Sequence, residues 1–182
     1  MKNYTLPLLA AILMLLFTQC HKYPDAILPE SVELGQSVIF MNAEKTEVFK
    51  PRIRQRSTHR NHIDFQFVEY RNDSLIQNTV VFYWVPLQIG EYTLTDDNSG
   101  PTGNALCGFG QRIDDDLPGY EYKLVDAQDG YFHLETLDTV NQIVSGRFRA
   151  KFKRTDRNGN RNMGLDKHII FEGVFHEHYT FY

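Results

Sequence analysis

Cysteine is scarce in this chain, whose 182 residues include only Cys20 and Cys107. The sequence around Cys20, described below, assigns that residue to a role outside the folded domain, which leaves Cys107 without a partner. We therefore expect one domain without disulfides, which at this length can rely on its hydrophobic core.

Basic charge is also in short supply. The chain has 19 lysines and arginines against 23 aspartates and glutamates, which gives a net charge of −4. Proteins that bind nucleic acid typically carry a basic excess on the binding domain. The charge balance therefore argues against nucleic acid as a partner.

Long apolar runs are missing except near the N-terminus. The run at residues 6–17 (LPLLAAILMLLF) follows the positive charge of Lys2. A membrane-spanning helix needs about 20 apolar residues, so this run is too short to span. A short apolar run behind a positive charge is typical of a signal peptide, which we predict over residues 1–19.

Cys20 follows this apolar run after only two polar residues, Thr18 and Gln19. A cysteine in this position resembles the lipobox of bacterial lipoproteins, where the thiol is acylated and the peptide is cut before the cysteine. Phe17 and Gln19 depart from that motif, which usually has a leucine and a small residue there. The resemblance implies a palmitate-type lipid anchor on Cys20, and His21 in the next position implies the outer membrane.

Residues 20–36 contain Pro24 and Pro29 and are predicted to form the lipidated cysteine and a tether to a single domain at residues 37–182. Each buried CH₂ group of an acyl chain contributes about 0.8 kcal/mol to membrane binding. Two or three chains on Cys20 would therefore hold the domain stably, on either the periplasmic or the surface side.

Helical periodicity is lacking after residue 37, where the dominant period of apolar residues is two. In residues 144–153 one set of alternate positions is apolar or small: Val144, Gly146, Phe148, Ala150 and Phe152. The intervening positions are polar: Ser145, Arg147, Arg149, Lys151 and Lys153. Successive side chains of a strand point to opposite faces, so this pattern predicts a strand with one buried face.

Other segments show strand patterns too. We predict strands at residues 38–41, 48–50, 63–67, 80–85, 92–95, 120–126, 131–137 and 171–181, with turns at residues 129–130 and 156–162. The stretch at residues 96–119 is predicted to be irregular. About eight to ten short strands predict an all-β fold, in the form of an antiparallel β-sandwich. A closed, lipocalin-like β-barrel is the alternative.

Three short motifs connect the chain to a known group of proteins. They are GEYTL at residues 90–94, LDTVNQIVSGRF at residues 137–148 and GVF at residues 173–175. With these motifs the chain resembles small bacterial lipoproteins with an uncharacterised β domain, the DUF6252-like family. The motifs are structural, so the resemblance implies a fold and a location and carries over no activity.

The polar face of residues 144–153 is a candidate binding site. Its cations are Arg147, Arg149, Lys151 and Lys153, and they repel one another unless negative charge faces them. This arrangement predicts a surface for an anionic glycan, an anionic lipid or an envelope protein. Pairing with acidic residues of adjacent strands, or protection of a sheet edge, is the alternative explanation.

A second candidate site is a metal centre near the C-terminus. On a strand, His176 and His178 point to the same side, and His168 is a candidate third ligand. A metal held by the protein needs three or four ligands. The alternative is that these histidines are the outward polar residues of a terminal strand. A further histidine cluster, at residues 59–62, is predicted to lie in a loop.

Motifs of well-known catalytic sites are missing. There is no HExxH and no Gly-x-Ser-x-Gly, and the glycine-rich stretch at residues 100–110 lacks the Lys-Ser/Thr of a phosphate-binding loop. We therefore predict a non-enzymatic, lipid-anchored domain of the cell envelope that binds a ligand or partner and uses no cofactor. The alternative is a small metal-dependent hydrolase that uses His176 and His178.

Overall fold

The computed structural model describes residues 25–46, 49–55, 57–58, 60–71, 75–112, 121–155 and 167–181. The described residues contain strands and no helix, which confirms the all-β prediction. The strands are β1 (Gln36–Met41), β2 (Glu44–Thr46), β3 (Phe49–Gln55), β4 (His62–Arg71), β5 (Leu75–Pro86), β6 (Gly90–Thr95), β7 (Ala105–Gln111), β8 (Glu121–Leu124), β9 (Tyr131–Asp138), β10 (Ile143–Thr155), β11 (His168–His178) and β12 (Thr180–Phe181). In these same residues, no helix is long and apolar enough to cross a membrane.

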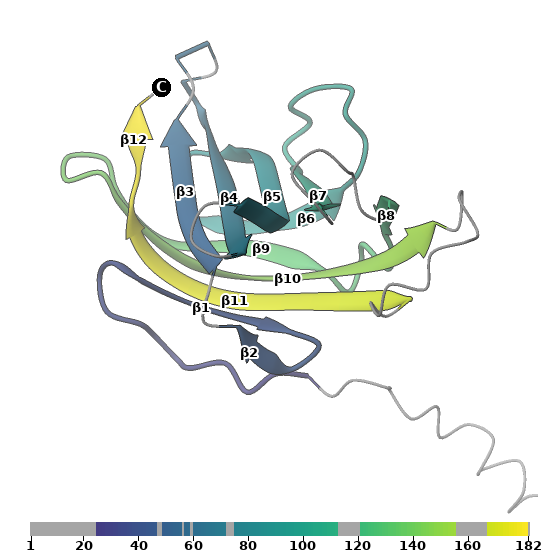
Figure 1. Ribbon diagram of the computed structural model, residues 1–182. Coiled ribbons are helices and arrows are strands. Elements are labelled where there is room, and N and C mark those ends of the chain that lie inside the picture. Colours follow the sequence, from purple (N-terminus) through teal and green to yellow (C-terminus); the bar gives the residue numbers. More distant parts are fainter. Residues whose placement is uncertain are drawn as a thin grey trace, which may run out of the picture.

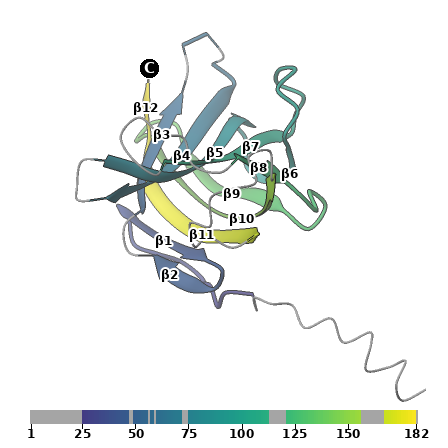
Figure 2. The same cartoon turned by 45° about the vertical axis from the view of Figure 1, so that its right-hand side comes forward.

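The strands form two facing layers (Figure 1). Their order is β12-β3-β4-β5-β7-β6-β9-β10-β11-β1-β2, and β8 pairs with β10 off this path. Neighbours are antiparallel except at two short parallel contacts, β6 with β7 and β12 with β3. The β6/β7 contact lies where the path passes from one layer to the other. The β12/β3 contact lies at one end of the path, where the chain has crossed from β11 to the facing layer, and a second view shows the two layers (Figure 2). The path is open, which confirms the sandwich rather than the closed barrel.

The longest strand, β10, follows the predicted alternation. Its side chains from Ile143 to Phe152 alternate between half-buried and buried positions. It pairs with β9 on one side and β11 on the other, and the β9 register shifts between Ser145 and Gly146. A Cβ atom on Gly146 would lie 2.3 Å from the carbonyl oxygen of His133, so this bulge requires glycine.

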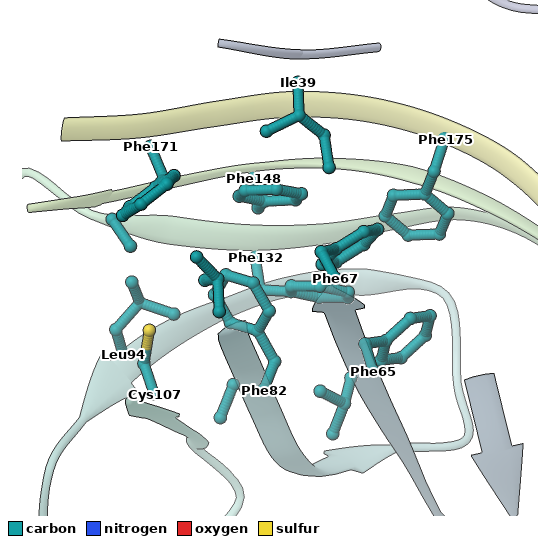
Figure 3. Packing of buried hydrophobic residues seen from close by; sticks show 14 of the residues in the cluster. Ile39, Phe65, Phe67, Phe82, Leu94, Cys107, Phe132, Phe148, Phe171 and Phe175 are labelled. Carbon is teal, nitrogen blue, oxygen red and sulfur yellow. The ribbon is translucent and has the colours of Figure 1, made fainter. Parts of the chain in front are cut away.

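Phenylalanine rings fill the space between the central strands of the two layers (Figure 3). Phe65 of β4 lies 4.6 Å from Phe132 of β9, and Phe67 of β4 lies 4.7 Å from Phe148 of β10, measured between ring centroids. The ring of Phe82 on β5 lies 4.8 Å from both Phe132 and Phe148. Such aromatic pairs add about 0.5–1.5 kcal/mol each beyond their burial. Because core rings occupy this region (Figure 3), the surfaces available for binding lie on the outer faces and at the ends of the layers.

Strand β7 corrects the sequence prediction, which treated residues 96–119 as irregular. Its buried positions are Ala105, Cys107 and Phe109, at the strand period of two. Gly108 and Gly110 occupy the alternate positions. The two large apolar side chains of this strand, Leu106 and Phe109, point to opposite faces, so the sequence shows no alternation of large apolar residues there. The predicted turn at residues 156–162 lies outside the described residues.

The described part of the predicted tether, residues 25–35, is docked onto the domain. Residues 25–35 contain no strand and run beside β1 and β11 (Figure 1). The chain then reverses direction in a turn, where the amide of Gln36 donates to the carbonyl of Glu33 at 3.0 Å. Gly35 has a φ of 84° in this turn, a conformation that glycine adopts without steric cost. We call residues 25–35 the docked segment.

Candidate functional site

The cationic stripe, defined as Arg147, Arg149, Lys151 and Lys153, lies on the outer face of β10. Arg147 forms an ion pair with Glu135 of β9, and Lys151 forms one with Asp126 after β8. The hydrogen bond and charge of Lys151 lower the pKa of Asp126. Acidic neighbours on the same layer therefore neutralise these two cations, as the alternative explanation of the stripe required.

Arg149 lies at the centre of a three-way contact. Its Nη1 donates to Oε1 of Glu172 on β11 at 2.8 Å, and its Nη2 donates to Oδ1 of Asp25 at 2.6 Å. Oε2 of Glu172 also accepts the backbone amide of Ala26 at 2.7 Å. Burial acts to lower the pKa of Arg149, but the hydrogen bond to Asp25 and the charge of Glu172 outweigh it and raise the pKa.

Three more hydrogen-bonding contacts hold the docked segment on β10 and β11. Nη2 of Arg147 donates to the carbonyl of Glu30 at 3.0 Å. Nδ1 of His176 lies 3.3 Å from the carbonyl oxygen of Val32, and the amide of Gly35 donates to the carbonyl of His176 at 2.7 Å. Two of the four stripe cations, Arg147 and Arg149, thus bind the chain's own N-terminal segment.

The other end of the stripe has a different environment. Lys153 is exposed and lies between Lys123 of β8 and His168 of β11 in the strand register. Lys123 and the neighbouring Lys167 are exposed as well. Over the described ranges, no carboxylate forms an ion pair with any of these three lysines. We call Lys123, Lys153, Lys167 and His168 the cationic end.

The titration of His168 reflects this environment. Burial lowers its pKa first, and the charges of Lys153, Lys151 and Lys167 lower it further. Asp126 acts in the opposite direction and has the smallest effect. Neighbouring cations therefore favour a neutral His168 and leave the positive charge on the lysines.

The structure brings together two of the three predicted metal ligands. His176 and His178 are two residues apart on β11, so they point to the same face of the strand. His168 stands at the opposite end of this strand, about 26 Å from His176 at the usual rise per residue. In the part of the chain that is described, no group of three or more His, Cys, Asp or Glu side chains is placed to hold a metal ion.

The residues around the histidine pair have other contacts. Glu177 points to the opposite face of β11 from the histidines, where its Oε1 accepts the hydroxyl of Ser37 at 2.9 Å. Burial raises the pKa of Glu177. Of the other histidine cluster, His62 opens β4, whereas His59 lies outside the described residues.

Cys107 is a free, buried cysteine in the core. Burial raises the pKa of its thiol well above the usual value. A nucleophilic cysteine needs the thiolate form, which a basic and partly exposed environment favours. The environment of Cys107 therefore favours a packing role.

Comparisons with protein-family models, with curated proteins and with solved structures find no match to this chain. Its function is therefore argued from its own residues. The sequence prediction located the stripe and its outward direction. It missed the docked segment, because Asp25 and Arg149 are 124 positions apart in the chain.

Proposed function

We propose that this chain is a lipid-anchored β domain of the cell envelope that binds a ligand or partner. Cys20 carries the lipid after removal of residues 1–19, and the outer membrane is the expected location. The observation that carries the proposal is the position of Cys20 directly behind the apolar run. Kinship with the DUF6252-like lipoproteins belongs to the same proposal.

The docked segment supports an anchor of this kind. Its first residue, Asp25, is five positions after Cys20 and is fixed to Arg149 by an ion pair. Five residues of extended chain reach at most about 17 Å. An anchor on Cys20 would therefore keep the domain within a short distance of the membrane surface.

Binding, rather than catalysis, is the role that the described surfaces favour. The cationic end offers three exposed lysines, Lys153 on β10, Lys123 on β8 and Lys167 just before β11, which suits an anionic glycan, lipid or envelope protein. The metal-dependent hydrolase stays the second candidate from the sequence, with His176 and His178 as the residues to test. Two imidazoles alone provide fewer ligands than a catalytic metal needs.

Cell fractionation of the full chain, produced in a bacterium that processes lipoproteins, tests the anchor. We expect the wild type and a Cys107→Ala control to be lipidated and to appear in the membrane fraction. We expect the Cys20→Ser variant to carry no lipid and to lose the membrane association that depends on the lipid. If Cys20→Ser is processed and retained like the wild type, the proposed anchor is wrong.

Thermal unfolding tests the two candidate roles against each other. A ligand that binds only the folded state stabilises it by about 2.7 kcal/mol at one hundred times its dissociation constant. We expect no effect of chelator or zinc and a raised midpoint with an anionic glycan or lipid. If chelator lowers the midpoint and zinc restores it, the hydrolase becomes the better hypothesis.

A further inference from the structure

The cationic end concentrates like charges that the strand pairing brings face to face. Lys153 is directly opposite Lys123 of β8, and on its other side it faces His168, whose neutral form the surroundings favour. Like charges directly opposite in a sheet are destabilising. Arg147, Arg149 and Lys151 on the same strand have carboxylate partners, whereas Lys153 has none among the described residues, which sets this end of β10 apart.

The docked segment leads from the domain toward this end. Its hydrogen bonds join Gly35 to His176, Glu30 to Arg147, and Asp25 to Arg149. Followed back toward the N-terminus, the segment therefore runs along β10 in the direction of Lys153. Four residues of strand separate Arg149 from Lys153, which is about 13 Å.

These distances connect the cationic end with the proposed lipid. Cys20 is five positions before Asp25, and five residues of chain reach at most about 17 Å. That reach covers the distance from Asp25 to the cationic end. The opposite end of β10, at Ile143, is about 20 Å from Arg149 along the strand. Followed toward the N-terminus, the docked segment runs away from that end.

We propose that the cationic end binds the anionic headgroups of the membrane in which Cys20 is anchored. This inference rests on the proposed lipid anchor and adds an orientation: the end of the sandwich formed by β8, β10 and the start of β11 faces the bilayer. The whole chain has a net charge of −4, so its overall charge does not attract it to an anionic membrane. A local cationic end beside the anchor turns one end of the domain toward the lipid.

Binding of the unlipidated domain to vesicles tests this orientation. The core residues all lie between Ile39 and Tyr179, so a chain starting at His21 keeps the complete core. We compare vesicles of phosphatidylcholine with and without phosphatidylglycerol. We expect binding only to the anionic vesicles and loss of binding at high salt, because salt screens exposed charges.

Two triple variants make the test specific. Lys123→Gln, Lys153→Gln and Lys167→Gln together remove three cations from the cationic end. Each basic residue near an anionic surface contributes about fivefold to binding, so we expect a loss of about one hundredfold. Lys50→Gln, Arg52→Gln and Arg60→Gln remove the same charge from exposed positions on β3 and the turn after it, and this control should bind like the wild type.

The outcomes separate this inference from the lipid anchor. Equal binding by both triple variants, equal binding to neutral vesicles, or binding to a free anionic glycan but not to vesicles overturns the proposed orientation. The domain in this assay carries no lipid, so none of these results depends on Cys20. Loss of vesicle binding in the cationic-end variant alone supports headgroup binding by the cationic end, and the fractionation experiment tests the anchor separately.

Discussion

Glu172 carries a charged side chain that is only 5% exposed, although it points to the outer face of β11. Arg149 and the backbone of Ala26 together provide its hydrogen-bond donors. A buried charge that loses its partner is costly, and removal of one member of a fully buried pair costs about 3–5 kcal/mol. The residue pair is therefore a sensitive probe of the docked arrangement.

Replacement of Arg149 by methionine should lower the free energy of unfolding by about 2–3 kcal/mol, less than for a fully buried pair because Arg149 is 24% exposed. Urea unfolding measures the change. A second substitution, Glu172→Gln, removes the unpaired charge and should restore part of the loss. A change below about 0.5 kcal/mol in the single variant would contradict the structural role of this pair.

Glu177 provides a pH-dependent test at the same scale. Burial raises its pKa above the ordinary value of 4.5, against smaller opposite effects of Ser37, His176 and His178. The folded state therefore keeps this proton to a higher pH than the unfolded chain does. Through this group, stability is highest below that ordinary value and falls as the pH rises through the folded pKa.

The variant Glu177→Gln should remove this fall in stability while it keeps an acceptor for the hydroxyl of Ser37. Unfolding at about pH 4 and about pH 7 should show a smaller loss of stability in the variant than in the wild type. Solvent screening keeps the difference below about 1 kcal/mol. A larger loss in the variant would mean that Glu177 is stabilised as a carboxylate.

At the scale of elements, the bulge between β9 and β10 depends on Gly146. An added Cβ would lie 2.3 Å from the carbonyl oxygen of His133 and 2.9 Å from the ring of Phe175. We expect Gly146→Ala to destabilise the domain by about 1–3 kcal/mol, as overpacking does. Gly110→Ala on β7 is the matched control, because no atom lies within 4 Å of its added Cβ. Equal stability of the two variants would show that the bulge tolerates a side chain.

The docked segment is a second element with its own prediction. A chain that begins at Gly35 lacks the contacts that Glu30 makes with Arg147, Asp25 with Arg149 and Ala26 with Glu172, whereas a chain that begins at Asp25 keeps them. Each hydrogen bond with a charged group contributes about 1.5–3 kcal/mol. We expect the shorter chain to unfold at a lower urea concentration than the longer one. Identical midpoints would mean that the segment contributes nothing to stability.

The strands differ in how well the sequence predicted them, for physical reasons. In residues 144–153 of β10, positions that are apolar or small alternate with polar positions, four of which are charged, so its faces were predictable. In β7, small residues hide the same alternation. The cover over Glu172 was not predictable, because it depends on the contact of Asp25 and Ala26 with a strand far along the chain.

At the scale of the whole molecule, the domain is a sandwich whose two layers are held together by aromatic packing. Its docked segment is bound across one outer face. The core between the central strands is filled by rings such as Phe67 and Phe148. Of the cationic stripe, Arg147 and Arg149 contact the N-terminal segment, Lys151 pairs with Asp126, and Lys153 is exposed at the cationic end. The docked segment follows the proposed anchor at Cys20 in the chain and leads toward the cationic end, which is the end that we propose to face the membrane.

The mass of the N-terminal peptide of the mature protein, isolated from bacterial membranes, tests the central claim most directly. The account predicts a peptide that begins at Cys20 and carries acyl chains on that residue. A peptide that begins at another residue, or one that begins at Cys20 without acyl chains, would contradict it.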